Sequence, residues 1–132
     1  MTSNESGPTV LVVDDQEAIR RIERRVLETH GYRVLEAEGA VEAIELLSAG
    51  APLDLLIADL DMPDVRGDEM VRRIRTTRPG LKVLYVSGQI NSLMDTRPLE
   101  DTEAFLEKPF TAPGLAQAVS LLIFGALKKP AP

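Results

Sequence analysis

The stretch from residue 9 to residue 15, TVLVVDD, decides how this chain folds. Its first five residues are apolar or β-branched and do not alternate with polar ones, which is typical of a strand buried on both faces of a parallel sheet. Asp14 and Asp15 follow at once, so the predicted strand ends on two carboxylates. A strand of this kind needs helices on both sides of its sheet, and the sequence that follows supplies them.

The spacing of apolar residues then switches repeatedly between the period of a helix and that of a strand. Residues 17–29 predict a helix with an apolar stripe, stopped by Gly31; the stripe comprises Ile19, Ile22, Val26 and Leu27. The other predicted strands are residues 32–37, 53–58, 82–86 and 104–107, and the other predicted helices are residues 41–48, 68–77 and 112–127, with a short helix and an acidic loop between 89 and 103. This alternation predicts an α/β fold, a doubly wound five-stranded parallel sheet. We expect a single domain over residues 9–127, between an N-terminal tail (1–8) and a C-terminal tail (128–132).

The composition excludes several classes of protein. The 132 residues are 44% hydrophobic and 27% charged, which is typical of a globular domain rather than a disordered or collagen-like chain. The chain has no Cys, which rules out disulfides, Cys-ligated zinc and a thiol nucleophile. A net charge of −6 and the lack of Trp argue against nucleic acid as a partner of this domain. Without a signal-like start or a long apolar run, we expect a cytoplasmic protein with no membrane contact.

Polar residues follow four of the predicted strands at the point where each ends. Asp14 and Asp15 follow the first strand, Asp59 the third, Ser87 the fourth and Lys108 the fifth. Each alone is also common as a helix cap, a turn residue or a solvated loop residue. The carboxyl ends of parallel strands meet at one edge of an open sheet, where ligands bind. We therefore expect these side chains to share one crevice.

The chemistry of this set indicates a hard metal ion and a phosphoryl group. Three carboxylates in one crevice repel one another and raise one another's pKa unless a cation is present. Mg²⁺ prefers oxygen ligands and commonly joins one or two carboxylates to a phosphate. A lysine and a hydroxyl are suitable partners for the remaining phosphoryl oxygens, one as a charge and one as a hydrogen-bond donor.

Taken together, these motifs closely resemble the receiver domain of two-component response regulators. The resemblance extends from Val10 to about Leu127 and rests on four stretches in the family's order: DD at 14–15, DLDMP at 59–63 with Gly67, SG at 87–88 and KPF at 108–110. It implies a flavodoxin-like fold with strand order 2-1-3-4-5. The stretches YVSG at 85–88 and AFLEKPF at 104–110 look most like receivers attached to hybrid sensor histidine kinases.

The resemblance also implies a role for each site residue. Asp59 would accept a phosphoryl group from a phosphohistidine of a histidine kinase or phosphotransfer protein, acting as a carboxylate nucleophile. Mg²⁺ would be the cofactor. Its ligands would be the side chains of Asp15 and Asp59 and the backbone carbonyl of Asp61, and Asp14 would hold it mostly through water. Lys108 and Ser87 would complete the phosphorylation site.

The family further implies a conformational switch and some local features. Ser87 would move toward the phosphoryl group while Phe105 turns inward, and this pair would change the affinity for an effector. Gly88 would leave room for the phosphoryl group, and the Lys108-Pro109 bond would be cis. The domain would catalyse its own phosphorylation and dephosphorylation, and would be a signalling domain rather than a conventional enzyme.

Two other functions remain open on the sequence. The stretch LLIADLD at 55–61 resembles the nucleophile strand of haloacid dehalogenase-type phosphatases, although there the Asp-x-Asp strand comes first and the acidic metal pair last. A receiver-like interaction module that never takes phosphate is the second alternative.

Other residues have ordinary structural interpretations. We expect His30 to sit at a helix end, and the arginine pairs at 20–21 and 24–25 to form a solvated helix face, with kinase docking as the alternative. Leu121 and Phe124 are expected outside the core, as a contact for a partner or a second copy. The effector and the oligomeric state are not specified by the sequence.

Overall fold

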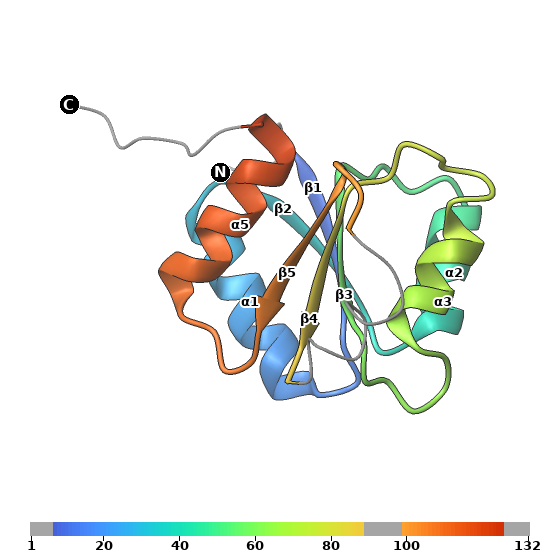
Figure 1. Ribbon diagram of the computed structural model, residues 1–132, viewed down its shortest axis with the longest axis horizontal. Coiled ribbons are helices and arrows are strands. Elements are labelled where there is room, and N and C mark those ends of the chain that lie inside the picture. The colour runs from blue at the N-terminus through green and yellow to red at the C-terminus, as the bar shows by residue number, and fades with distance from the viewer. Residues whose placement is uncertain (1–6, 89–98, 126–132) are drawn as a thin grey trace.

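The computed structural model describes residues 7–88 and 99–125 and contains a five-stranded sheet between two layers of helices (Figure 1). The strands are β1 (Thr9–Val13), β2 (Arg33–Ala37), β3 (Leu55–Asp59), β4 (Val83–Ser87) and β5 (Glu103–Glu107). Their order is β2-β1-β3-β4-β5, and every neighbouring pair is parallel. The predicted doubly wound sheet and its strand order are therefore confirmed.

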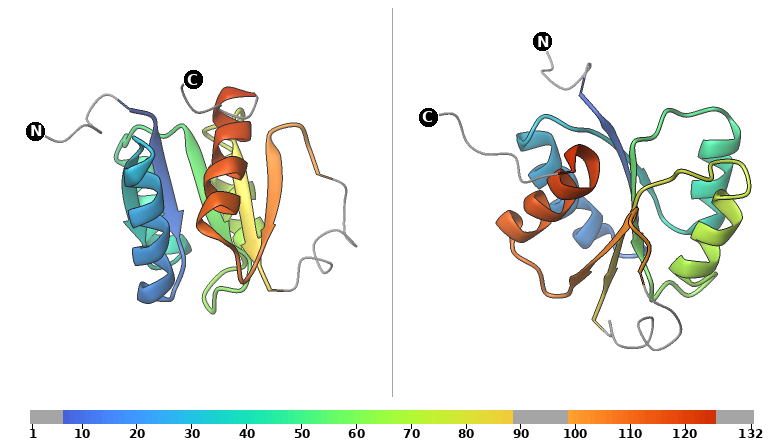
Figure 2. Two further views of the ribbon diagram at one scale, coloured as in Figure 1. Left: turned by 90° about the vertical axis from the view of Figure 1, so that its left-hand side faces the viewer. Right: turned by 45° about the horizontal axis from the view of Figure 1, so that its top comes forward.

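The helices cover both faces of this sheet. They are α1 (Glu17–Thr29), α2 (Ala40–Ser48), α3 (Gly67–Ile74) and α5 (Ala112–Phe124). Helices α1 and α5 lie on one face, and α2 and α3 lie on the other, as the right-hand view of Figure 2 shows. Successive β1 side chains alternate between two cores, with Leu11 in the core on the α2 and α3 side and Val12 in the core on the α1 and α5 side. This explains why the central strands have no polar face.

Several elements begin or end a few residues from the predicted positions. Strand β3 starts at Leu55 and includes Asp59, and β4 extends to Ser87, so both polar residues are the last of their strands. Helix α3 ends at Ile74, three residues earlier than predicted. Helix α5 ends at Phe124 because Gly125 has a left-handed φ of 75°. The predicted end at residue 127, and residues 89–98 of the predicted short helix and loop, lie outside the described residues.

The buried face of α1 differs from the predicted apolar stripe. The buried residues are Arg20, Glu23 and Leu27, whereas Ile22 is 51% exposed. The expectation that Arg20 belongs to a solvated face is thus wrong. Its guanidinium Nη1 donates to the backbone oxygen of Asp14 at 2.7 Å, and its Nε donates to Glu36 Oε1 at 3.3 Å. These two bonds hold Arg20 between the end of β1 and strand β2.

The remaining structural expectations agree with the observed environments. His30 is exposed after the last turn of α1, with its ring Nδ1 2.9 Å from the Val26 carbonyl oxygen. Leu121 and Phe124 are 47% and 51% exposed on α5. Within residues 7–88 and 99–125, none of the helices has the length and apolar character needed to cross a membrane.

Candidate functional site

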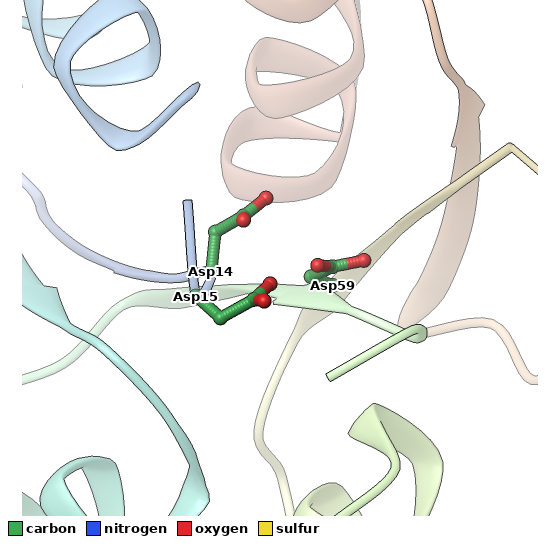
Figure 3. Close-up of side chains that lie close together, drawn as sticks. All are labelled: Asp14, Asp15 and Asp59. Carbon is green, nitrogen blue, oxygen red and sulfur yellow. The ribbon is translucent and has the colours of Figure 1, made fainter. Parts of the chain in front are cut away.

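The two aspartates after β1 and the aspartate that ends β3 meet at one edge of the sheet (Figure 3). Carboxylate oxygens of Asp14, Asp15 and Asp59 all lie within 4.8 Å of one another. Asp14 and Asp59 are 1% and 2% exposed, while Asp15 is open to solvent. Because β1 and β3 are adjacent parallel strands, their carboxyl ends bring these side chains together, as the sequence predicted.

Lys108, just after β5, extends its ammonium group to this cluster. Its Nζ lies 3.2 Å from Asp14 Oδ2 and 3.4 Å from Asp59 Oδ1. Burial lowers the pKa of Lys108, but the neighbouring Asp14 and Asp59 carboxylates outweigh that effect and leave the pKa above its usual value. The lysine is therefore a fixed positive charge at the cluster. The peptide bond between Lys108 and Pro109 is cis, as the family resemblance implies.

Within residues 7–88 and 99–125, the ammonium charge of Lys108 is outnumbered by the three carboxylates of this cluster. Burial raises the pKa of Asp59, and the Asp14 carboxylate adds to the rise, while a hydrogen bond from the Asp61 N–H and the charge of Lys108 oppose it. The net pKa of Asp59 stays above its ordinary value, so its ionised form is held at a cost. The candidate metal ligands in the cluster are all carboxylate oxygens, which suit Mg²⁺ or another hard cation. The residues present thus fit the metal that the sequence predicts.

Ser87 and Asp61 lie beside Asp59 on the β4 side. Ser87 is fully buried, and its hydroxyl Oγ donates to Asp61 Oδ2 at 2.9 Å. The Asp61 backbone N–H donates to Asp59 Oδ1 at 3.1 Å. Next to Ser87, a Cβ added to Gly88 would have no atom of the described residues, 7–88 and 99–125, within 4 Å.

Gly67, at the start of α3, allows the backbone to pass close to the site. A Cβ at this position would lie within van der Waals overlap of the Asp59 carbonyl oxygen, at 2.4 Å. The first turn of α3 therefore packs directly against the end of β3. A side chain here would clash with the backbone of Asp59 and Leu60.

Phe105 is half-buried on β5 and contacts a second aromatic ring. Its ring centroid lies 5.8 Å from that of Tyr85 on β4, at an interplanar angle of 45°. The Tyr85 hydroxyl donates to Glu103 Oε2 at 3.0 Å, and Arg75 Nη1 donates to the same oxygen at 2.8 Å. The predicted switch pair, Ser87 and Phe105, thus occupies β4 and its neighbour β5.

Glu23 is a residue near the site that the sequence reasoning missed. It lies on the inner face of α1, is 1% exposed, and its Oε1 has no hydrogen-bond partner in the part of the chain that the structure describes. Burial raises the pKa of Glu23 to about 8; Asp14 and Asp59 add to the rise, and Lys108 opposes it. The position of Glu23 between Arg20 and Leu27 on one helix face could have revealed it. The predicted apolar stripe placed Ile22 inward, and so left Glu23 outside.

The chain belongs to the response regulator receiver domain family, whose model matches residues 10–120. It is similar to the sensor kinase CckA of Brucella abortus, with 34% identity over 124 residues, which is 92% of this chain and 13% of the kinase. The chain therefore spans a small part of that relative.

Solved structures agree with the family assignment. A response regulator receiver protein from Sinorhizobium medicae has a TM-score of 0.82 and 28% identity, covering 90% of this chain and 96% of that one. The response regulator TrrA from Thermotoga maritima, solved in complex with Mg²⁺-BeF, has a TM-score of 0.74 and 27% identity, covering 87% and 98%.

Proposed function

We propose that this receiver domain accepts a phosphoryl group on Asp59, with Mg²⁺ as cofactor, and passes the signal on through Ser87 and Phe105. The observation that carries the proposal is the charge arrangement: Asp14, Asp15 and Asp59 within 4.8 Å of one another, with the ammonium group of Lys108 at 3.4 Å from Asp59 Oδ1. Ion pairs of Lys108 with the buried Asp14 and Asp59 would not require a further carboxylate, Asp15, that is open to solvent. Such a cluster is suited to a cation and an anionic group arriving from solvent.

The proposed reaction is a simple displacement at phosphorus. A carboxylate oxygen of Asp59 forms a bond to the phosphorus of a phosphohistidine, the P–N bond breaks, and the imidazole leaves and takes up a proton from solvent. Lys108 already faces Asp59 and can offset charge on the transferred oxygens. The residues of the site position groups and balance charge, and no other side chain needs to take part covalently.

The proposed metal ligands are the carboxylates of Asp14, Asp15 and Asp59 and the backbone carbonyl of Asp61. Bound there, Mg²⁺ would neutralise carboxylate charge and draw phosphoryl oxygens toward the site. The TrrA complex with Mg²⁺-BeF supports this proposal, since TrrA is a relative of the same fold.

The proposed donor is a histidine kinase or a phosphotransfer protein, in keeping with the family and with the similarity to a sensor kinase. A domain within a hybrid kinase and a separate response regulator would both use this site. The proposed output is a change of affinity for an effector at the face that includes Phe105.

The proposal is tested by intact-mass measurement after incubation with acetyl phosphate, with and without Mg²⁺. We expect one added phosphoryl group that requires Mg²⁺ and is absent from Asp59→Asn. The matched control is Asp101→Asn, which removes an exposed carboxylate outside the site and should be phosphorylated like the wild type.

Released phosphate is measured in the same samples, because rapid hydrolysis would hide the adduct. Phosphate release that needs both Asp59 and Mg²⁺ would support the proposal with a short-lived adduct. An adduct that forms equally in Asp59→Asn would contradict it. If neither the adduct nor released phosphate is found, the result favours a phosphate-independent binding module.

A further inference from the structure

The hydroxyl hydrogen of Ser87 is already engaged in the resting protein. Ser87 Oγ lies 2.9 Å from Asp61 Oδ2. An ionised carboxylate only accepts hydrogen bonds, so the serine is the donor in this pair. A serine hydroxyl has a single hydrogen, which cannot be donated fully to Asp61 and to another acceptor at the same time.

Asp61 is held in this position by the residue that would be phosphorylated. Its backbone N–H donates to Asp59 Oδ1 at 3.1 Å, and the same oxygen lies 3.4 Å from Lys108 Nζ. The backbone N–H of Lys108 in turn donates to the Ser87 carbonyl oxygen at 2.9 Å. Asp59, Asp61, Ser87 and Lys108 therefore form a closed ring of contacts, in which Asp61 joins Asp59 through its backbone and Ser87 through its carboxylate.

We propose that Asp61 is a positioning residue that holds the Ser87 hydroxyl in the resting state and competes for it with a phosphoryl group on Asp59. This inference rests on the proposed function. The two acceptors are both anions, so the phosphoryl group gains the serine hydrogen only when the Ser87–Asp61 bond breaks. The competition lowers the affinity of the site for a phosphoryl group or its analogue. Replacing Asp61 by a residue without an acceptor would remove the competition.

Charge repulsion by Asp61 would also oppose a phosphoryl group, and a double-mutant cycle separates the two effects. Asp61→Ala removes both the charge and the hydrogen-bond acceptor. In a Ser87→Ala background there is no hydroxyl to hold, so Asp61→Ala then reports the charge effect alone. Asp61→Asn keeps an acceptor oxygen without the charge and should fall between the wild type and Asp61→Ala.

The affinity for beryllium fluoride, a phosphoryl analogue, is measured by isothermal titration calorimetry at Mg²⁺ concentrations that saturate each variant. In the presence of Ser87, we expect Asp61→Ala to tighten binding about tenfold, the size of one charge-assisted hydrogen bond. In the Ser87→Ala background, we expect a clearly smaller gain. Equal gains in the two backgrounds would overturn the proposal, because Asp61 would then act by charge only.

The resting bond is checked without any ligand, by urea unfolding of the same four proteins in the presence of a chelator. The two substitutions should be non-additive, since either one removes the same hydrogen bond. Additive midpoints would overturn the inference while leaving phosphorylation of Asp59 intact. A wild type that binds no beryllium fluoride at any Mg²⁺ concentration would contradict the proposed function itself, and the inference would fall with it.

Discussion

The buried carboxyl of Glu23 makes the stability of this domain depend on pH, and one substitution removes that dependence. Glu23→Gln preserves the size of the side chain but cannot ionise. The pKa of Glu23 is about 8 in the folded protein, against an ordinary 4.5. The unfolded chain therefore loses this proton at a lower pH than the folded one. The stability that neutral Glu23 contributes is fully present below about pH 4.5 and is lost as the pH rises to about 8.

The size of the effect follows from the two pKa values. Each pH unit between them costs about 1.4 kcal/mol of folding free energy, so the whole interval corresponds to at most about 5 kcal/mol. Between pH 5 and pH 8 the expected loss is about 3 to 4 kcal/mol. That is a large part of the roughly 5 to 15 kcal/mol typical of a domain. Glu23→Gln should therefore become more stable relative to the wild type as the pH rises.

Urea unfolding followed by circular dichroism measures this difference at pH 5, 6.5 and 8, with a chelator present. Taking the variant minus the wild type at each pH cancels the titration of groups that the two proteins share. The control is Glu17→Gln on the same helix, whose side chain is 71% exposed and whose difference from the wild type should stay constant. A Glu23→Gln difference that is the same at pH 5 and pH 8 would refute the reasoning.

Three further predictions concern the contacts that support the site, each measured as a shift of the urea midpoint at an unchanged slope. Gly67→Ala places a Cβ 2.4 Å from the Asp59 carbonyl oxygen and should destabilise the fold by about 1 to 3 kcal/mol; a wild-type midpoint would show that the backbone yields freely. Thr111→Ala removes the side-chain cap of α5 and should cost about 1 kcal/mol, whereas no loss would mean that solvent replaces the cap. Arg75→Ala removes the ion pair between Arg75 and Glu103, whose side chain is fully buried, and should cost about 3 kcal/mol; a loss below about 1 kcal/mol would contradict the ion pair's role.

The sheet could be predicted from the sequence because buried parallel strands have a distinctive composition. Runs such as residues 10–13 and 55–58 are apolar throughout, and the acidic residues after them mark the strand ends. Strand order, in contrast, came from the family resemblance, since the apolar runs alone do not say which strands are neighbours. Element ends were less accurate; α5 stops at Phe124 because Gly125 takes a left-handed conformation, which composition does not reveal.

The error on α1 has a physical cause. Sequence periodicity assumes that apolar residues face inward, but Arg20 and Glu23 occupy inward positions while Ile22 faces solvent. Arg20 is held by the Asp14 backbone oxygen at the edge of the site. Polar residues that support a functional site can thus occupy inward positions and interrupt the apolar periodicity from which a core is predicted.

The sequence predicted that the polar residues at the strand ends would share one crevice, but it did not predict their contacts or the nearby Glu23. Strand ends alone bring Asp14, Asp59 and Lys108 together. The bond between Ser87 and Asp61 depends on the conformation of the β3–α3 loop, which the sequence does not specify.

The central claim is that Asp59 carries the phosphoryl group, and borohydride trapping tests it most directly. Acetyl phosphate and Mg²⁺ are added to the wild type, and borohydride then reduces an aspartyl phosphate to homoserine at the position that carried it. Tandem mass spectrometry of the tryptic peptides reads that position. We predict homoserine at position 59 in the wild type, dependent on Mg²⁺ and acetyl phosphate. Homoserine at position 14 or 15, or none under conditions that give the phosphoryl adduct, would contradict the account.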